Sequence, residues 1–193
     1  MTNPINTSSI AEQIAEHTRV VGRAGAHAKL LEQIAERVIC CFEGGGRVYL
    51  LGNGGSAADA QHIAAELVGR FKRDRRALPA MALTTDSSNL TAISNDLGYE
   101  NVFARQIEAL VTSRDIVWAL SVSGTSPNVL AGLKAARKIG ATVVGFTGRS
   151  GGAMVELCDL CFRVDHESSD RVQEVHQLAY HLVCERIETH FVG

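Results

Sequence analysis

The chain has 193 residues, of which 46% are hydrophobic, and its formal net charge is −2 at pH 7. This length favours a single domain with a substantial buried core. A nearly neutral chain without a long block of like charge argues against nucleic acid as a partner. No secretory signal opens it and no apolar run approaches the roughly 20 residues that span a bilayer, so we expect a cytoplasmic protein without membrane contact.

The five cysteines are an odd number, which fits reduced thiols better than a disulfide framework. Cys158 and Cys161 have the C-x-x-C spacing of some redox and zinc sites. They lie inside an apolar run, Leu157 to Val164, and no second pair accompanies them. We therefore interpret both as buried strand residues.

Two helices are predicted before the first strand. Ser9 and Glu12 form a capping-box pair at the start of the first helix, which the glycines at positions 22 and 25 end. Apolar residues recur at helical spacing from Ala26 to Phe42, which predicts the second helix. This helical arm, residues 1–43, either packs against another copy of the chain or covers the sheet.

From residue 44 to residue 193, apolar runs alternate with helical patterns. The predicted strands are Val48–Leu51, Ala80–Leu83, Ile116–Leu120, Thr142–Phe146 and Leu160–Val164. The predicted helices are Ser56–Arg70, Asn101–Val111, Ser126–Lys138 and Arg171–Phe191. This alternation predicts an α/β fold with a doubly wound, five-stranded parallel sheet flanked by helices. Ligands of such sheets bind beyond the carboxyl ends of the strands, near the point where strand order reverses.

A glycine-rich turn, Gly52 to Ser56, follows the first predicted strand and opens a helix. Gly54 and Gly55 let the backbone approach a ligand, and Ser56 can cap the helix while offering its hydroxyl. Free N–H groups at a helix start favour an anion. The turn therefore predicts a phosphate-type site.

A second polar loop, Ser121 to Ser126, follows the third predicted strand, and Pro127 is well placed as a first helical residue. Its hydroxyl and N–H groups would form a neutral cradle, because no Walker lysine is present. That cradle suits the phosphomonoester of a small metabolite better than a nucleoside triphosphate. The alternative is that the serines only cap a helix.

Two further segments, Thr84 to Ser88 and Ser94 to Gly98, have the composition of turns. Within the second, Asn95 and Asp96 either belong to ordinary turn chemistry or hydrogen-bond to the hydroxyls of a sugar.

Spacing on two helices suggests a shared metal ion or substrate. His62 and Glu66 are four residues apart and so lie on one helix face. Gln173 and His181 are separated by roughly 12 Å along the last helix, so long side chains leaning together can just reach one metal. The alternative for a histidine on such a helix is a hydrogen-bonded core residue, and we assign His176 and His190 to it.

Taken together, the Gly52–Ser56 turn with His62 and Glu66, the Ser121–Ser126 loop, and the stretch from Arg171 through Gln173 to His181 resemble the phosphoheptose isomerase family. These proteins have a sugar-isomerase (SIS) domain, a flavodoxin-like and Rossmann-like fold, and the resemblance covers nearly the whole chain. It implies one SIS domain over residues 1–193. It also implies conversion of sedoheptulose 7-phosphate to D-glycero-D-manno-heptose 7-phosphate through an enediol, the first step toward ADP- or GDP-activated heptose for bacterial surface polysaccharide.

The resemblance also implies the site residues and the assembly. Zinc would be held by His62, Glu66, Gln173 and His181, with Glu66 and His181 also the acid/base pair. The assembly would be a homotetramer with active sites between subunits. Substrate contacts are expected from Asn53, Gly54, Gly55, Ser56, Glu66, Asn95, Asp96, Ser121, Val122, Ser123, Ser126 and Gln173. Val122 departs from the family, in which threonine is frequent, so any phosphate contact there would come from the backbone N–H.

Two other functions are compatible with parts of the sequence. The first is a non-catalytic SIS-domain protein that binds the replication initiator, which would need neither Glu66 nor His181. The second is an NAD-dependent oxidoreductase, since Gly52-x-Gly54-x-x-Ala57 fits a loose dinucleotide fingerprint and Asp86 stands near the end of the second strand. Retention of both Glu66 and His181 favours the isomerase.

Overall fold

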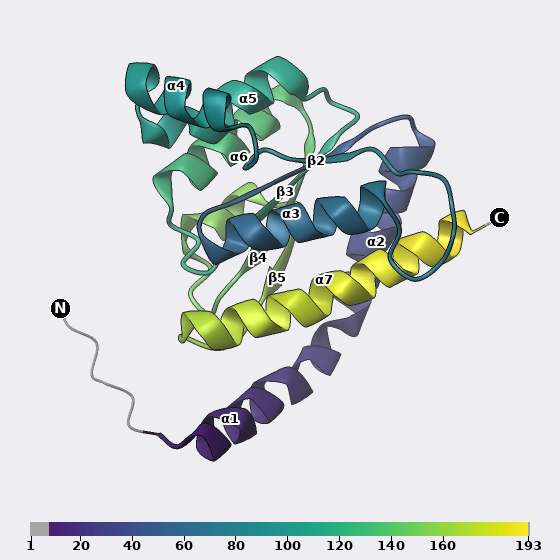
Figure 1. Cartoon of the computed structure of the whole chain (residues 1–193), viewed down its shortest axis with the longest axis vertical. Helices are drawn as coiled ribbons and strands as arrows, with labels where there is room; N and C mark the ends of the chain where they lie inside the picture. Colours follow the sequence, from purple (N-terminus) through teal and green to yellow (C-terminus); the bar gives the residue numbers. More distant parts are fainter. Residues whose placement is uncertain (1–7, 193) are drawn as a thin grey trace.

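Five parallel strands form the centre of the molecule in the order β2-β1-β3-β4-β5 (Figure 1). A computed structural model describes residues 8–192, so the ends of the predicted domain lie outside the described residues. The strands are β1 (Val48–Gly52), β2 (Ala80–Ala82), β3 (Ile116–Ser121), β4 (Thr142–Thr147) and β5 (Leu160–Arg163). The predicted fold class is confirmed, and strand order reverses between β1 and β3.

Helices cover both faces of the sheet. Along β1 the side chains alternate, so Val48 and Leu50 face one layer while Tyr49 and Leu51 face the other. The first layer contains α2 (Ala28–Glu43), α3 (Gly55–Val68) and α7 (Ser169–Phe191), and the second contains α5 (Val102–Leu110) and α6 (Pro127–Ile139). Covering on both faces explains why β1 and β3 are buried along their whole length.

The first helix, α1 (Ile10–Gly22), begins at the predicted capping box, in which the Ser9 and Glu12 side chains each accept the other's backbone N–H. A short 3-10 helix, Ala24–His27, joins it to α2. Figure 1 shows α1 extending away from the sheet beside the first turns of α7. Ile10 and Ile14 are 78% and 61% exposed, so α1 leaves apolar surface uncovered.

One helix was not expected from the sequence. The end of the first predicted turn segment and most of the second belong to α4 (Ser87–Leu97). Asp86 caps this helix by accepting the backbone N–H of Asn89. None of the α4 residues is fully buried, although Leu90 and Ile93 pack partly against the core of the second layer. The short apolar stripe of Leu90, Ile93 and Leu97 was missed among the polar residues of this segment.

The two C-x-x-C cysteines are only partly as predicted. Cys161 lies in β5 and Cys158 lies just before it, at the end of the 3-10 helix Gly152–Leu157. Both are half-buried rather than buried, because β5 is an edge strand of the sheet. No helix among the described residues has the length and hydropathy required to cross a membrane.

The two remaining histidines of α7 differ. His176 is fully buried and lies 3.1 Å from the Thr147 carbonyl oxygen through Nε2, as predicted. His190 is exposed and pairs with Glu43 at 2.8 Å, so its assignment to the core was wrong.

Burial lowers the pKa of His176 to about 4. In the folded protein this imidazole therefore stays neutral down to about pH 4, whereas in the unfolded chain it takes up a proton near pH 6.5. We therefore expect the free energy of unfolding to fall progressively as pH falls from 6.5 to 4. His176 alone should account for about 3 kcal/mol of this decrease. Urea unfolding across that range should show this dependence of the free energy of unfolding on pH, and the slope should be smaller in His176→Gln. His190→Gln, on the exposed side of the same helix, should change the slope much less. Equal slopes in wild type and His176→Gln would contradict this origin.

Candidate active site

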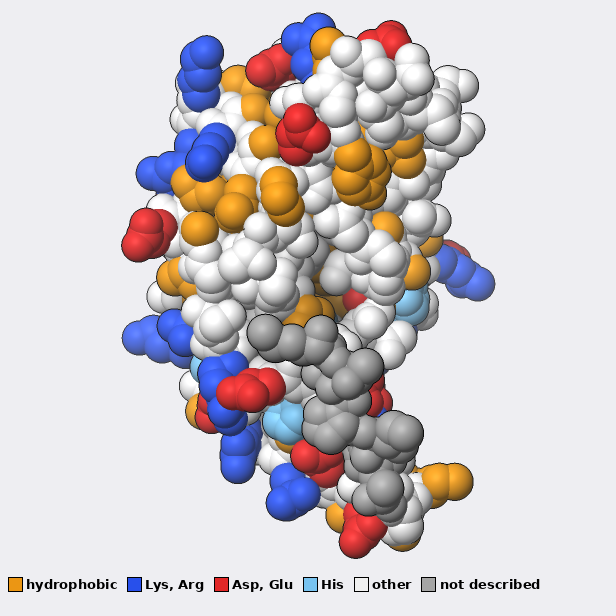
Figure 2. Space-filling view, turned by 90° about the vertical axis from the view of Figure 1, so that its left-hand side faces the viewer, with side chains coloured by type: hydrophobic (Ala, Val, Ile, Leu, Met, Phe, Trp, Pro, Cys, Tyr) orange, Lys and Arg blue, Asp and Glu red, His pale blue; other side chains and the backbone are white. Residues whose placement is uncertain are grey.

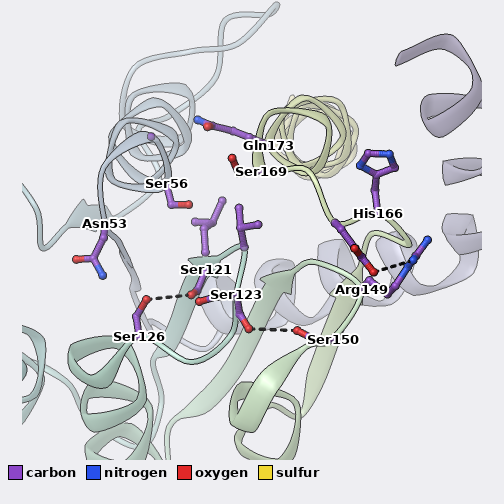
Figure 3. Close-up of a pocket in the computed structure, with 14 residues that line it drawn as sticks. Asn53, Ser56, Ser121, Ser123, Ser126, Arg149, Ser150, His166, Ser169 and Gln173 are labelled. Carbon is purple, nitrogen blue, oxygen red and sulfur yellow. Dashed lines mark hydrogen bonds and ion pairs between the residues drawn. The ribbon is translucent and has the colours of Figure 1, made fainter. Parts of the chain in front are cut away.

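The turn after β1 brings the backbone sharply into α3. Gly54 has φ 55° and ψ −122°, a conformation that side-chain-bearing residues rarely adopt. The helix begins at Gly55 and has no side-chain cap, so the prediction that Ser56 caps it was wrong. Ser56 lies instead in the first turn of α3, and Figure 3 shows its hydroxyl directed toward the cavity.

The loop after β3 presents unpaired donors to the same cavity. Pro127 is the first residue of α6, as predicted, and the Ser126 hydroxyl makes no cap hydrogen bond but lies 3.5 Å from the Ser121 hydroxyl. In the described part of the chain, the N–H groups of Val122, Ser123 and Ser126 donate no hydrogen bond. Hydroxyls and free N–H groups beside a helix start form an anion cradle.

These two loops meet at the reversal of strand order between β1 and β3, which is where such sheets bind ligands. The cavity there has a volume of about 700 Å³ (Figure 3). It is lined by Asn53, Gly55, Ser56, Leu120, Ser121, Val122, Ser123, Ser126, Arg149, Ser150, His166, Glu167, Ser169 and Gln173. Eight predicted substrate residues are in this set. The sequence did not predict the lining residues that come from the loops after β4 and β5 and from the start of α7, which are Arg149, Ser150, His166, Glu167 and Ser169.

The guanidinium of Arg149, although it lines the cavity, is already paired. It lies 2.7 Å from Asp165 and 3.0 Å from Glu167. These hydrogen bonds and charges raise the pKa of Arg149. Arg149 is thus engaged with two carboxylates, which is compatible with the predicted cradle of neutral donors.

Four of the predicted substrate residues do not line this cavity. Gly54 and Glu66 are outside the lining set, although both belong to the turn and helix that border it. Asn95 and Asp96 lie on α4, exposed and hydrogen-bonded to each other at 2.7 Å. Substrate contact by these four residues stays a prediction.

His62, Glu66 and His181 come together between α3 and α7. Their potential ligand atoms all lie within 4.8 Å of one another, and His62 Nε2 is 3.0 Å from Glu66 Oε1. Two imidazoles and a carboxylate are a donor set that zinc accepts in catalytic sites, which keep a further position open. The residues present therefore fit the predicted metal.

Gln173, the fourth predicted ligand, occupies a different position. Its amide donates to Asp59 Oδ2 at 3.1 Å, and a Cβ on Gly55 would lie 2.4 Å from its Oε1. A side chain at position 55 would displace the flexible end of Gln173 from this position. Gln173 also lines the cavity. It therefore lies between the cavity and the cluster of His62, Glu66 and His181.

Asp59 and Tyr180 were missed by the sequence analysis. The Tyr180 hydroxyl lies 3.0 Å from His62 Nδ1 and 3.4 Å from Asp59 Oδ1. Both residues are buried, and burial raises the pKa of Asp59 although Gln173 and Tyr180 donate to it. A hydroxyl and a carboxylate behind a metal-binding histidine fix its ring and tautomer. Positions 59, 62 and 66 share one helical face, which is the signal that could have revealed Asp59.

His181 lies among aromatic rings and beside the Glu66 carboxylate. Burial and, next, the nearby His62 lower its pKa. Its ring lies 5.0 Å from the His62 ring and 4.7 Å from the Tyr180 ring, centroid to centroid. An imidazole kept neutral near pH 7 can accept a proton and return it.

Comparison with known proteins gives consistent results. Residues 12–148 match the SIS domain family. A phosphoheptose isomerase of a Roseiflexus species is 57% identical over 161 residues, covering 83% of this chain and 82% of that protein. One from Burkholderia pseudomallei is 49% identical over 187 residues, 95% of each chain. The solved structure of phosphoheptose isomerase from Neisseria gonorrhoeae has 39% identity and a TM-score of 0.88, covering 93% of this chain and 97% of that one.

Proposed function

This chain belongs to the phosphoheptose isomerase family of SIS-domain proteins, and we propose that it converts sedoheptulose 7-phosphate to D-glycero-D-manno-heptose 7-phosphate. It is an aldose–ketose isomerase. The observation that carries this function is the position of the phosphate-type cavity, which Gln173 joins to the cluster of His62, Glu66 and His181. A sugar phosphate can therefore be anchored at one end and react at the other.

The phosphate is bound by the neutral cradle. Ser121, Ser123 and Ser126 supply hydroxyls, and the start of α6 supplies free N–H groups. Val122 contributes its N–H, since its side chain lacks a hydroxyl. Ser56 lies roughly 9 Å from His62 along the helix axis, at six residues of 1.5 Å rise. An extended seven-carbon sugar phosphate can span that distance, so phosphate binding orients the reacting carbons.

The isomerisation moves a proton between adjacent carbons through an enediol. Glu66 removes the proton from C1 of the ketose, exchanges it with solvent while the enediol is present, and delivers a proton to C2. His181 takes the proton from the C1 hydroxyl and delivers one to the C2 oxygen, so both protons balance. One carboxylate and one imidazole are sufficient for this chemistry, and the low pKa of His181 keeps that ring able to accept.

We propose zinc as the cofactor, held by His62, Glu66 and His181, with the Gln173 amide as a fourth ligand after release from Asp59. When bound, zinc supplies Lewis-acid polarisation of the substrate's oxygen. A Glu66 carboxylate that coordinates zinc tightly would be a weaker base. Glu66 would therefore bind zinc and remove the substrate proton at different stages.

The proposed assembly is a homotetramer with active sites between subunits. Figure 2 shows exposed hydrophobic side chains grouped on the upper part of one face, where Figure 1 places α4, α5 and α6. Leu97 on α4, Tyr99 just after it and Leu110 at the end of α5 are 48%, 57% and 41% exposed. Sedimentation equilibrium is expected to give four times the chain mass of 20.7 kDa; a monomer would contradict the proposal.

Membership of the family supports the remaining assignments of this proposal. The enzyme acts in the cytoplasm on a sugar phosphate, and its product enters activated-heptose synthesis. The relatives reported above are named as isomerases, and nothing favours the initiator-binding alternative. Asp86 is occupied as the cap of α4, where it also accepts the Asn89 amide at 2.8 Å, which weakens the oxidoreductase alternative.

Turnover of sedoheptulose 7-phosphate by the purified protein tests the function directly. The aldose product is followed before chelation, after chelation, and after zinc is restored. Activity that chelation removes and zinc restores supports both the reaction and the cofactor. A folded oligomer that makes no aldose under any of these conditions would contradict the function.

A further inference from the structure

A buried carboxylate far along α7 holds the segment that joins α3 to β2. Figure 1 shows this segment crossing α7 before it returns to the sheet. Glu188 is 2% exposed. It accepts the backbone N–H groups of Phe71, Lys72 and Arg73 at 2.8, 2.8 and 3.1 Å. Three donors on one carboxylate fix three consecutive residues of the segment.

Arg75 completes the anchor. Its side chain is 1% exposed, and its Nε lies 3.7 Å from Glu188 Oε1. The same guanidinium donates to the carbonyl oxygens of Glu66 and Gly69. The charge of Glu188 is therefore compensated, and the segment is tied to the last turn of α3, which carries Glu66.

The anchored segment presents one aromatic ring to the proposed active site. The Phe71 ring stacks on the His181 imidazole, with centroids 5.4 Å apart and planes 6° from parallel. This is the offset-stacked arrangement that aromatic rings favour. The χ2 angle of histidine has no sharp intrinsic preference, so a flat neighbour determines the plane in which the ring nitrogens point.

We propose that Phe71 is a positioning residue for His181 and that Glu188 holds Phe71 in place. The inference rests on the proposed acid/base role of His181. Phe71 touches no reacting atom in this account. It keeps the imidazole plane aligned toward His62 and Glu66, and the hydrogen bonds of Glu188 keep the Phe71 ring from turning toward solvent.

The first test compares Phe71→Leu with Phe71→Tyr in the zinc-loaded tetramer. Leucine keeps apolar volume but has no plane, whereas tyrosine keeps the ring. Phe71→Leu is expected to lower kcat about tenfold with KM within about twofold, because alignment acts on the chemical step. Phe71→Tyr should retain wild-type kcat. Phe71→Leu with kcat within twofold of wild type would overturn the proposal.

The second test addresses the anchor with a matched control on the same helix. Glu188→Gln removes the charge and leaves one oxygen for three donors, so kcat should fall as in Phe71→Leu. Glu185→Gln removes the exposed partner of Lys72, 2.9 Å away, and should leave kcat unchanged. Equal effects of the two variants would overturn the role of Glu188.

A double-mutant cycle shows whether Phe71 acts through His181. In a His181→Gln background, Phe71→Leu should cause no further loss of kcat, since the aligned ring is absent. A tenfold loss in both backgrounds would mean that Phe71 acts elsewhere and would overturn the inference. A wild-type enzyme without turnover would instead contradict the proposed function, a result distinct from an active wild type that tolerates Phe71→Leu.

Discussion

Glu66→Gln is expected to lower kcat by roughly 10²–10⁴-fold, the usual contribution of a general acid or base. Glutamine keeps the size of the side chain and a hydrogen-bonding oxygen for His62, but it cannot take a proton from carbon. His181→Gln should cause a loss of similar size because the oxygen proton has no carrier. Folding should survive, since neither the Glu66 nor the His181 side chain belongs to the hydrophobic core.

Steady-state turnover of sedoheptulose 7-phosphate measures both losses. Glu108→Gln is a matched control, because Glu108 is an exposed partner of Arg105 at 2.9 Å on the opposite layer of helices. It should keep wild-type kcat. Folded Glu66→Gln or His181→Gln enzymes with wild-type turnover would show that the acid/base assignment is wrong.

Tyr180→Phe is expected to weaken zinc binding about 10–100-fold, the usual effect of removing a residue that orients a metal-binding histidine. The substitution deletes the hydroxyl between His62 Nδ1 and Asp59. It leaves the buried ring in place. His62 then loses the contact that fixes its tautomer and ring orientation.

A competition titration against a chromophoric chelator gives the zinc affinity without any assay of turnover. Tyr49→Phe is the matched control, since it deletes another hydroxyl of a buried tyrosine, bonded to the Leu110 carbonyl at 3.1 Å. That variant should bind zinc as wild type does. Equal zinc affinity of wild type and Tyr180→Phe would contradict the proposal that Asp59 and Tyr180 orient His62.

The sheet could be predicted because its signals are local. β1 and β3 are buried on both faces, so each is a continuous apolar run that ends at a glycine or serine loop. The parallel order then places those two loops together. The positions of these strands were therefore sufficient to predict where the cavity lies, but not the lining residues that follow β4 and β5.

The helix α4 could not be predicted in the same way. Its sequence from Ser87 to Leu97 is rich in serine, threonine and asparagine, which are poor helix formers. It also buries no residue. The local signals were the Asp86 cap, three residues before the N–H that it accepts, and the helical spacing of Leu90, Ile93 and Leu97.

The site was predicted in part, according to how far each contact reaches along the chain. His62 and Glu66 are helical neighbours, so spacing revealed them. Tyr180 meets Asp59 across the packing of α3 on α7, and Phe71 meets His181 through a loop with no regular pattern. Contacts of this kind depend on tertiary packing, which a single sequence does not display.

Isomerisation in D₂O tests the central claim most directly, because it follows the proton that Glu66 is proposed to carry. Wild-type enzyme and sedoheptulose 7-phosphate are incubated in D₂O, and carbon-bound deuterium is located by NMR. A carboxylate that exchanges with solvent while the enediol is present should place deuterium at C2 of the aldose or at C1 of the recovered ketose. Product that retains only protium at both carbons, formed by an active wild-type enzyme, would contradict the account.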